Sequence, residues 1–523
     1  MLFRSLELAN NLIREINRLW VKNSKKFILE IKKNLEERRE RSGNCAYLLE
    51  PDLKEARGGL RDVNILRGLI AFNNQEEGIP IAMDRLAIAS STLANIRDEV
   101  QAASNPPRDL LTFGIQDQIA TKLNFGSADE LLLEVAKSAR TVNYLISLQL
   151  HRLEHSNSKS FSFVPSRDRD TGEEIEPNIW LRDGEIHLIP NQDPFLALRA
   201  GAIAAQRGIP LNSESCQEVV NNFGRLPDLW PRNSREDLVA LLGAGRAMVG
   251  VFEILDQEGL MELWIPEWKH LQFLPQRNAL HRHTVDRHSL ETAVFASELT
   301  RTVRRPDLLL IAALFHDLGK GFKDEDHSEK GAQLIVPLAK RLGFKPAEVE
   351  TLRILVKEHL TLSSVATRRD LDDPATYRSL QDLIPDLETL NILHALSIAD
   401  GQATGVAAWS SWKAKLVDTL VNGLSTHRDG VKISPNFELS ASQQEIMARR
   451  ELHVSISGYD DNFEIEVISK DRTGLLSTVA GVLSVLRGEI RSAKTKTIGE
   501  MAVMRWIVNF DPLAPIQIGR AHV

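Results

Sequence analysis

Apolar residues recur at helical spacing through most of this chain. Positions three and four residues apart are apolar throughout 60–155, most regularly in DELLLEVAKSARTVNYLISLQLHRLEH (129–155), and again in 193–207 and 235–262. Residues 2–41 show the same spacing on either side of a polar stretch at 22–26, which predicts two helices there. The pattern therefore predicts a mainly α fold.

Two regions depart from helical spacing. In the first, FSFVPS and NIWLRDGEIHLIP have the alternation of short strands, and Asp183-Gly184 is a dipeptide favoured in tight hairpin turns. This predicts a small β insertion at 161–190. In the second, a polar linker or short helix at 440–451 precedes the strand FEIEVIS (463–469), a helix at 475–488 and the strands IRSAKTKTI and AVMRWIVNF. This β-α-β-β order is typical of half a ferredoxin-like sandwich, a small α+β part.

Length and composition narrow the function classes. A chain of 523 residues is too long for one core and predicts two to four domains. With 64 basic and 71 acidic residues, a net charge of −7, no broad basic surface is expected, so nucleic acid is not the default partner. Cys45 and Cys216 cannot form a disulfide framework and are expected in the core, in a reducing, cytoplasmic setting. The longest apolar runs, such as 308–315, fall short of the roughly 20 residues of a membrane span.

Histidines and aspartates gather in helix-compatible segments of the second half. The segments are HRHTVDRHSLE (281–291), LFHDLGKG (314–321), DHSEKGA (326–332), VKEHL (356–360) and IAD (398–400). Adjacent residues on a helix project about 100° apart, so His316 and Asp317 can approach one ion from neighbouring directions. His288 and Asp400 would complete the ligand shell from two other helices.

Imidazole and carboxylate ligands without cysteine favour Mn, Fe, Zn or Mg and argue against a closed structural zinc site. Such a site keeps open positions for water and phosphate. The ion lowers the pKa of bound water and offsets charge on phosphoryl oxygens, which points to phosphoester hydrolysis.

These residues resemble the HD phosphohydrolase superfamily, whose pattern is a His, a His-Asp pair and a distant Asp. His288, His316-Asp317 and Asp400 match it one by one. The resemblance implies an all-helical domain with one or two divalent ions, Mn or Mg, and extra ligands at His327 and His359. His316 and Asp317 would be catalytic, and Lys320 could reach a phosphate as a point charge. His281 and His283 are left open, as groups that support ligands or face the substrate.

YLLEPDLKEARGGLRD (47–62) distinguishes among HD families. With HTVDRH (283–288), HLTLSSVATRRDLDDP (359–374) and ADGQATGVAAWSSWK (399–413), it resembles the bifunctional uridylyltransferase/uridylyl-removing enzymes that modify the PII signalling protein. Stringent-response synthetase-hydrolases share these domain types, but their HD part comes first. The resemblance implies PII as partner and hydrolysis of a nucleotidyl-tyrosine bond.

One element of that family is missing. Its transferase core carries a Gly-Ser turn followed by a D-x-D pair, and none occurs between Met1 and Leu60. The nearest string, GSADE (126–130), is expected only to cap a helix through Ser127. We therefore expect the chain to start inside the transferase domain and not to transfer UMP. Glu50, Asp52, Lys54, Arg57 and Arg61 line the transferase remnant or form a solvated rim.

SKDRTGLLSTVAGVL (469–483) resembles the ACT-domain signature, a strand ending before a Gly and a helix. The free amides at that helix start, with Gly474 permitting close approach, can bind an amino-acid carboxylate. The resemblance implies glutamine as effector, bound by Asp471, Arg472, Gly474 and Leu475. The family has two such domains and this chain holds one. Its last six residues, IGRAHV, match an in-frame translation of a common sequencing adapter and are expected to be non-native.

The expected organisation has five parts. They are a transferase remnant (1–70), a helical linker region with the β insertion (71–275), the HD phosphohydrolase domain (276–440), the ACT domain (460–517) and the tail (518–523). Two alternatives to PII demodification stay open. One is an HD hydrolase of free nucleotides such as guanosine polyphosphates, and the other is a non-catalytic scaffold that binds PII and amino acids.

Overall fold

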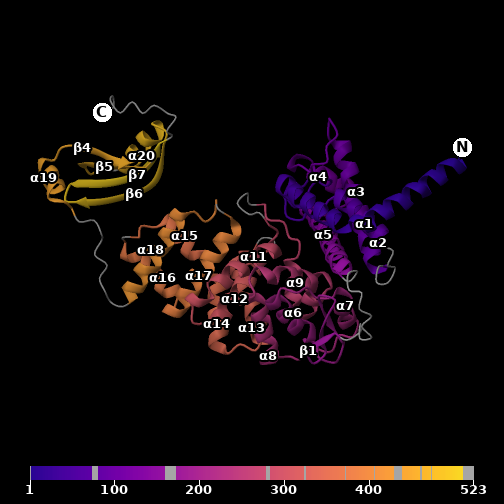
Figure 1. Ribbon diagram of the computed structural model, residues 1–523. Coiled ribbons are helices and arrows are strands. Elements are labelled where there is room, and N and C mark those ends of the chain that lie inside the picture. Colours follow the sequence, from indigo (N-terminus) through magenta and orange to yellow (C-terminus); the bar gives the residue numbers. More distant parts are fainter. Residues whose placement is uncertain are drawn as a thin grey trace. The chain divides into compact units, whose positions relative to one another are not determined.

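A computed structural model describes ten stretches of the chain. They are residues 2–73, 80–158, 172–277, 283–322, 325–371, 373–405, 407–428, 439–459, 462–472 and 474–510. The chain divides into two compact units, residues 1–431 and 432–523. The first is helical apart from one small sheet, and the second carries a four-stranded sheet (Figure 1). The predicted fold class, mainly α with small α+β parts, is confirmed.

The first unit begins with five helices that contact one another. They are α1 (Leu2–Ser42), α2 (Leu60–Asn73), α3 (Pro80–Ala103), α4 (Phe113–Lys122) and α5 (Ala128–Ser158). The prediction of two helices within 2–41 was wrong, because α1 runs through the polar stretch at 22–26 without a break. That stretch contains neither Gly nor Pro, so nothing in it costs enough to end a helix. The expected cap of α5 is confirmed, since the Ser127 hydroxyl accepts the backbone N–H of Glu130 at 3.2 Å.

The predicted β insertion is a three-stranded antiparallel sheet. It consists of β1 (Glu173–Glu176), β2 (Ile179–Arg182) and β3 (Glu185–Leu188), in that order. Asp183 and Gly184 form the turn between β2 and β3 and both have positive φ, 52° and 80°. These values confirm the hairpin prediction, because such a turn needs residues that tolerate the left-handed region. The part of the insertion call at 161–171 lies outside the described residues.

Helices resume after β3 and continue to the end of the unit. The first group is α6 (Leu196–Arg207), α7 (Ser213–Asn221), α8 (Arg232–Gly243), α9 (Arg246–Gln257), α10 (Leu260–Trp264) and η2 (Pro266–His270). The second group is α11 (Val285–Glu298), η3 (Thr300–Thr302), α12 (Pro306–Phe315), α13 (His327–Arg341), α14 (Pro346–Lys357), α15 (Thr361–Arg368), α16 (Pro374–Leu383), α17 (Leu387–Thr404) and α18 (Ser411–Arg428). In this second group α11, α14 and α17 all pack against α12.

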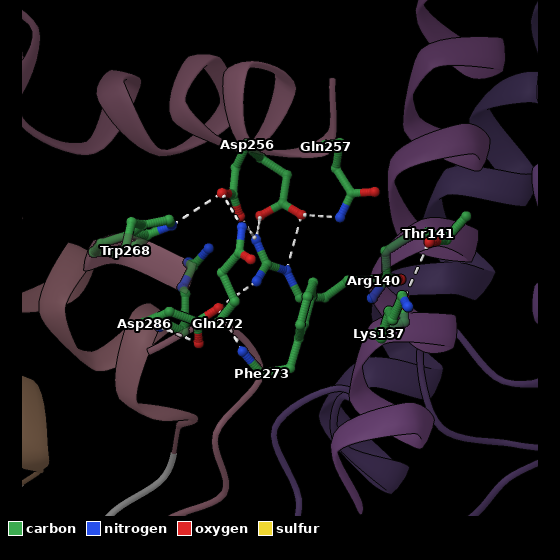
Figure 2. A network of polar contacts seen from close by, with 12 residues as sticks. Lys137, Arg140, Thr141, Asp256, Gln257, Trp268, Gln272, Phe273 and Asp286 are labelled. Atoms are coloured by element: carbon green, nitrogen blue, oxygen red, sulfur yellow. Dashed lines mark hydrogen bonds and ion pairs between the residues drawn. The ribbon is translucent and has the colours of Figure 1, made fainter. Parts of the chain in front are cut away.

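A buried guanidinium ties α5 to α9 and α11. Figure 2 shows Arg140 reaching from α5 towards Asp256 and Asp286, and its side chain is only 4% exposed. It donates to Glu253 at 2.8 and 3.0 Å, to Asp256 at 3.0 Å and also to Asp286. Because buried charges are costly unless they are paired, this network fixes the three helices against one another.

The second unit is built on one antiparallel sheet. Its elements are α19 (Ala441–Arg449), β4 (His453–Tyr459), β5 (Asn462–Lys470), α20 (Leu475–Val485), β6 (Gly488–Ile498) and β7 (Met501–Phe510), with strand order β4-β5-β7-β6. The predicted β-α-β-β order and the short helix before it are present. Strand β4 was not predicted, although it pairs with β5 along its whole length.

The two faces of this sheet are covered differently. Helix α20 packs over a core that includes Val467, Trp506 and Val508. The alternate residues Ile468 and Val503 pack with Ile446 of α19 on the other face. Thus the unit has one helix on each face of its sheet.

Both cysteines are buried and unpaired, as expected. None of the described helices combines the length and apolar character that crossing a bilayer requires.

Candidate metal centre

Apolar packing of α12 places the His-Asp pair. All eight residues from Leu308 to Phe315 are buried, and Pro306 begins the helix at a position that needs no N–H donor. His316 and Asp317 follow directly and are themselves buried. The polar pair is therefore held inside the helical core, where it must find polar partners or an ion.

Three side chains from three segments form a first ligand group. His288 Nε2 of α11 lies 2.9 Å from Asp400 Oδ1 of α17 and 3.3 Å from His316 Nε2. The three ligand atoms all lie within 4.8 Å of one another. The structure therefore brings together residues separated by more than 100 positions in the sequence, as the HD pattern predicted.

A second ligand group adjoins the first. It consists of Asp317, His327 and His359, again with ligand atoms within 4.8 Å of one another. His327 is the first residue of α13, whose start is capped by the Asp326 carboxylate, which accepts the N–H groups of Ser328 and Glu329. His359 follows α14 and is buried.

Asp317 joins the two groups through its two carboxylate oxygens. Its Oδ2 lies 3.3 Å from His316 Nε2 and 3.8 Å from His288 Nε2. Its Oδ1 lies 3.7 Å from His359 Nε2 and 3.9 Å from His327 Nε2. A carboxylate placed in this way can bridge two cations.

Backbone carbonyls orient two of the imidazoles. His316 Nδ1 lies 2.9 Å from the carbonyl oxygen of Ala313, and His359 Nδ1 lies 2.7 Å from that of Val356. A carbonyl can only accept, so each Nδ1 carries a proton and each Nε2 is the nitrogen that faces the site. This orientation is the one that a metal ligand needs, and an ion would bind Nε2 in its unprotonated form.

The electrostatics of the site favour a cation. Burial and the neighbouring His316 lower the pKa of His359 to about 4, so this imidazole is neutral at physiological pH. Burial acts against charge on Asp317, but Lys320 and His316 outweigh it and hold the carboxyl pKa well below its usual range. Burial likewise opposes a charge on His316, yet Asp317 and Asp400 raise its pKa to about 10. Asp317 and Asp400 are thus both ionised, and a divalent ion bound beside them would take the place of the second proton of His316.

Lys320 lies beside the bridging carboxylate. Its Nζ donates to Asp317 Oδ2 at 2.6 Å and to Gln276 Oε1 at 2.7 Å. Gln276 in turn donates to the carbonyl oxygen of His283 at 3.1 Å. The sequence analysis assigned no role to Gln276, since nothing in its local pattern marks it as a partner of a residue 44 positions away.

Two further neighbours of the site were also missed. Asp286 lies within the quoted HTVDRH motif, and its contacts with Arg140 and the Phe273 N–H fix the first turn of α11. Lys413 lies in the quoted segment 399–413. Burial lowers the pKa of its ammonium group, and the Asp400 carboxylate partly offsets this effect by favouring the charged form.

The two histidines left open by the sequence analysis have different outcomes. His283 contacts the ring of Tyr47 edge-on, and His281 lies outside the described residues.

The charged residues of 50–61 have internal partners. Glu50 accepts the N–H of Phe113 at 2.7 Å, Asp52 accepts those of Lys54 and Glu55, and Arg61 forms a two-pronged contact with Glu55. These contacts give Glu50, Asp52 and Arg61 structural partners within the chain.

The four residues expected to bind an effector meet in the turn between β5 and α20. Asp471 Oδ2 accepts the hydroxyl of Thr497 at 2.9 Å, and the Leu475 N–H donates to the carbonyl of Arg472 at 3.1 Å. Gly474 precedes α20 with φ +82°, a conformation that other residues adopt only at a cost.

Comparison with known proteins agrees with this geometry. A family model described as HD domain matches residues 285–400, and one described as GlnD PII-uridylyltransferase matches residues 26–77. A bifunctional uridylyltransferase/uridylyl-removing enzyme of Streptomyces coelicolor is 42% identical over 423 residues, which are 78% of this chain and 50% of that protein. The chain is a homologue of these bifunctional enzymes.

Two further relatives carry the same name. That of Mycobacterium tuberculosis strain CDC 1551 is 35% identical over 96% of this chain and 63% of its own length. That of Corynebacterium glutamicum is 31% identical over 71% of this chain and 53% of its own length. The chain thus spans between half and 63% of the length of these relatives.

Proposed function

We propose that this chain removes a uridylyl group from the PII protein by hydrolysing a nucleotidyl-tyrosine phosphodiester at the HD site. The observation that supports this proposal most directly is the position of Asp317, whose two carboxylate oxygens contact the two ligand groups. The names of the relatives and of the family model supply the reaction and the protein substrate.

Each residue of the site has a role in this proposal. His288, His316 and Asp400 would hold one divalent ion, Mn or Mg, and Asp317 would hold a second with His327 and His359. Bound ions supply an acidified water and offset negative charge on the phosphoryl group. Lys320 orients Asp317 and offers its ammonium to a phosphoryl oxygen.

The proposed function also gives a role to each domain of the chain. We assign residues 276–440 to the hydrolase domain, with residues 1–70 and 71–275 preceding it as the transferase-related and linker parts. We assign residues 460–517 to an ACT-like domain that binds glutamine at Asp471, Arg472, Gly474 and Leu475. The position of Gly474 at the start of α20 supports that assignment, since it provides no side-chain cap there and a helix start attracts a carboxylate.

A direct assay tests the hydrolase proposal. The full chain, supplied with Mn²⁺, is incubated with uridylylated PII and separately with a guanosine polyphosphate, and released UMP or pyrophosphate is measured. UMP release that is abolished by Asp317→Ala supports the proposal. Hydrolysis of the free nucleotide alone would replace it with the first alternative, and no hydrolysis of either would favour a scaffold.

A further inference from the structure

The chain turns back on itself soon after the proposed metal ligand Asp400. Helix α17 ends four residues later, and the N–H of Gly405 donates to the carbonyl of Gly401 at 3.2 Å. The N–H groups of Ala408 and Trp409 then donate to the carbonyl of Gly405 at 2.9 and 3.0 Å. These bonds form a compact turn between α17 and α18, which brings Trp409 back to the end of α17.

The Trp409 ring lies against the backbone of the residue that follows Asp400. A Cβ on Gly401 would lie 2.3 Å from Cε3 and 2.6 Å from Cδ2 of that ring. Carbon atoms pack at roughly 3.5–4.0 Å, so the ring occupies the space that a side chain at position 401 would need. Trp409 therefore fixes the turn against α17 beside the backbone of Asp400.

Two contacts hold the Lys413 side chain on the same turn. Its Nζ donates to the carbonyl of Ala408 at 3.1 Å and lies 5.8 Å from the centroid of the Trp409 ring. An ammonium group within about 6 Å of an aromatic ring is attracted to it. These contacts place the ammonium near the end of α17, where the Asp400 carboxylate acts on its charge.

The ammonium group of Lys413 has donors to spare. It carries three N–H groups, and the Ala408 carbonyl accepts one of them. Among the described residues no carboxylate forms an ion pair with it, whereas Lys320 donates to both Asp317 and Gln276. Burial lowers the pKa of Lys413, because its charge is incompletely solvated. A bound anion would supply the missing partner.

Solvent reaches the first ligand group at Asp400. The Asp400 side chain is 17% exposed, whereas those of His288 and His316 are 2% and 0% exposed. A phosphoester that meets an ion held by these three residues must approach through the exposed part of the group. Asp400 is also the carboxylate that acts on Lys413. Lys413 therefore lies on the side from which a phosphoryl group would enter.

We propose that Lys413 donates to a phosphoryl oxygen of the substrate at the first ligand group, and that Trp409 positions Lys413 for this contact. This role rests on the proposed function, because it needs a phosphoester bound at the metal centre. Each ligand group then has one lysine beside its carboxylate, Lys413 in the first group and Lys320 in the second. Both ammonium groups offset negative charge on the phosphoryl group.

Inorganic phosphate is the probe for this contact. The full chain is loaded with Mn²⁺, freed of excess ion by gel filtration and titrated with phosphate in a calorimeter, and its Mn content is measured in parallel. Lys413→Gln should raise the phosphate Kd about tenfold or more, because one charge-assisted hydrogen bond is lost, and should keep the Mn content of the wild type. Lys413→Arg retains the charge and should bind phosphate more tightly than Lys413→Gln.

Trp409→Leu tests the positioning role. It should also raise the phosphate Kd, because the ammonium group loses the ring that it contacts. Combined with Lys413→Gln it should add little further loss, since Trp409 acts through Lys413. Lys415→Gln is the control, because Lys415 is an exposed lysine of the same helix, and its Kd should equal that of the wild type.

Three results would overturn the role of Lys413. They are no phosphate binding by the Mn-loaded wild type at about 1 mM, equal Kd values for wild type and Lys413→Gln, and a loss of Mn in Lys413→Gln, which would make Lys413 a support of the ligands. Additive losses in the double variant would overturn the positioning role of Trp409. Failure of the proposed function looks different, because uridylylated PII would then release no UMP although phosphate binding still depends on Lys413.

Discussion

Gly319 packs directly against the backbone carbonyl of His327. A Cβ at position 319 would overlap that oxygen, and it would also lie 2.5 Å from the N–H nitrogen of Gly331. The turn after the His-Asp pair can approach α13 this closely only because Gly319 has no side chain. This contact sets the distance between Asp317 and His327.

Gly319→Ala should therefore push α13 away from the His-Asp pair. We expect a loss of about 1–3 kcal/mol of stability, as for overpacked cores, and weaker metal binding by the Asp317-His327-His359 group. Urea unfolding and metal titration measure both effects. Gly68→Ala in α2 is the control, since a Cβ there meets nothing within 4 Å and should stabilise by about 0.5–1 kcal/mol. Equal metal affinity in the two variants would contradict the role of Gly319.

Because Asp317 contacts both ligand groups, its replacement should weaken metal binding at both. Asp317→Ala should lower metal content by more than His359→Ala, because His359 belongs to one ligand group only. Metal analysis of purified protein after dialysis gives the content. Adding Mn²⁺ to wild type at about 100 times its Kd should stabilise the fold by about 2.7 kcal/mol per ion, and EDTA should remove that gain.

His394 provides the control for this experiment. It pairs with Asp418 at 2.9 Å, is also partly buried, and belongs to neither ligand group. His394→Ala should keep the metal content of the wild type. The bridging role fails if Asp317→Ala retains as much metal as His394→Ala.

The sequence predicts the local features of this fold well. The apolar run before His316, the Asp183-Gly184 hairpin and the Ser127 cap each depend on neighbours in the chain, and the structure has all three. The resemblance of the histidines and aspartates to the HD pattern indicated which side chains would meet, and the structure brings them into two adjoining groups.

Non-local partners could not be read from the sequence. Arg140 contacts Asp286 across 146 positions, and no sequence pattern near either residue indicates the other as its partner. Strand β4 carries Val454 and Ile456 on an edge where they stay about half exposed, so its apolar signal is weak and its identity depends on pairing with β5. Helix α1 shows the opposite error, because its polar stretch at 22–26 was interpreted as the boundary between two helices.

Arg140 should be among the most destabilising positions to replace. Arg140→Met leaves Glu253, Asp256 and Asp286 without their cation, and breaking a buried ion pair in this way costs about 3–5 kcal/mol. Urea unfolding measures the change. Arg232→Met, on the exposed surface of α8, should change stability by about 0.5 kcal/mol or less. A similar small loss for both variants would mean that the network contributes little to the fold.

Two glycines of the second unit should respond oppositely to alanine. Gly474 precedes α20 with φ +82°, and placing an alanine in the left-handed region costs about 1–2 kcal/mol. Gly481 lies inside the same helix with nothing within 4 Å of a new Cβ, so alanine there should stabilise by about 0.5–1 kcal/mol. Thermal unfolding of the full chain measures these changes. The fluorescence of Trp506 reports on this unit when the other tryptophans are replaced by phenylalanine in all variants.

The same pair of variants tests the proposed amino-acid site. If Gly474 also shapes that site, Gly474→Ala should weaken glutamine binding while Gly481→Ala leaves it unchanged. Equal stabilities of the two variants would show that the turn before α20 does not require glycine, and the proposed carboxylate site would lose its structural basis.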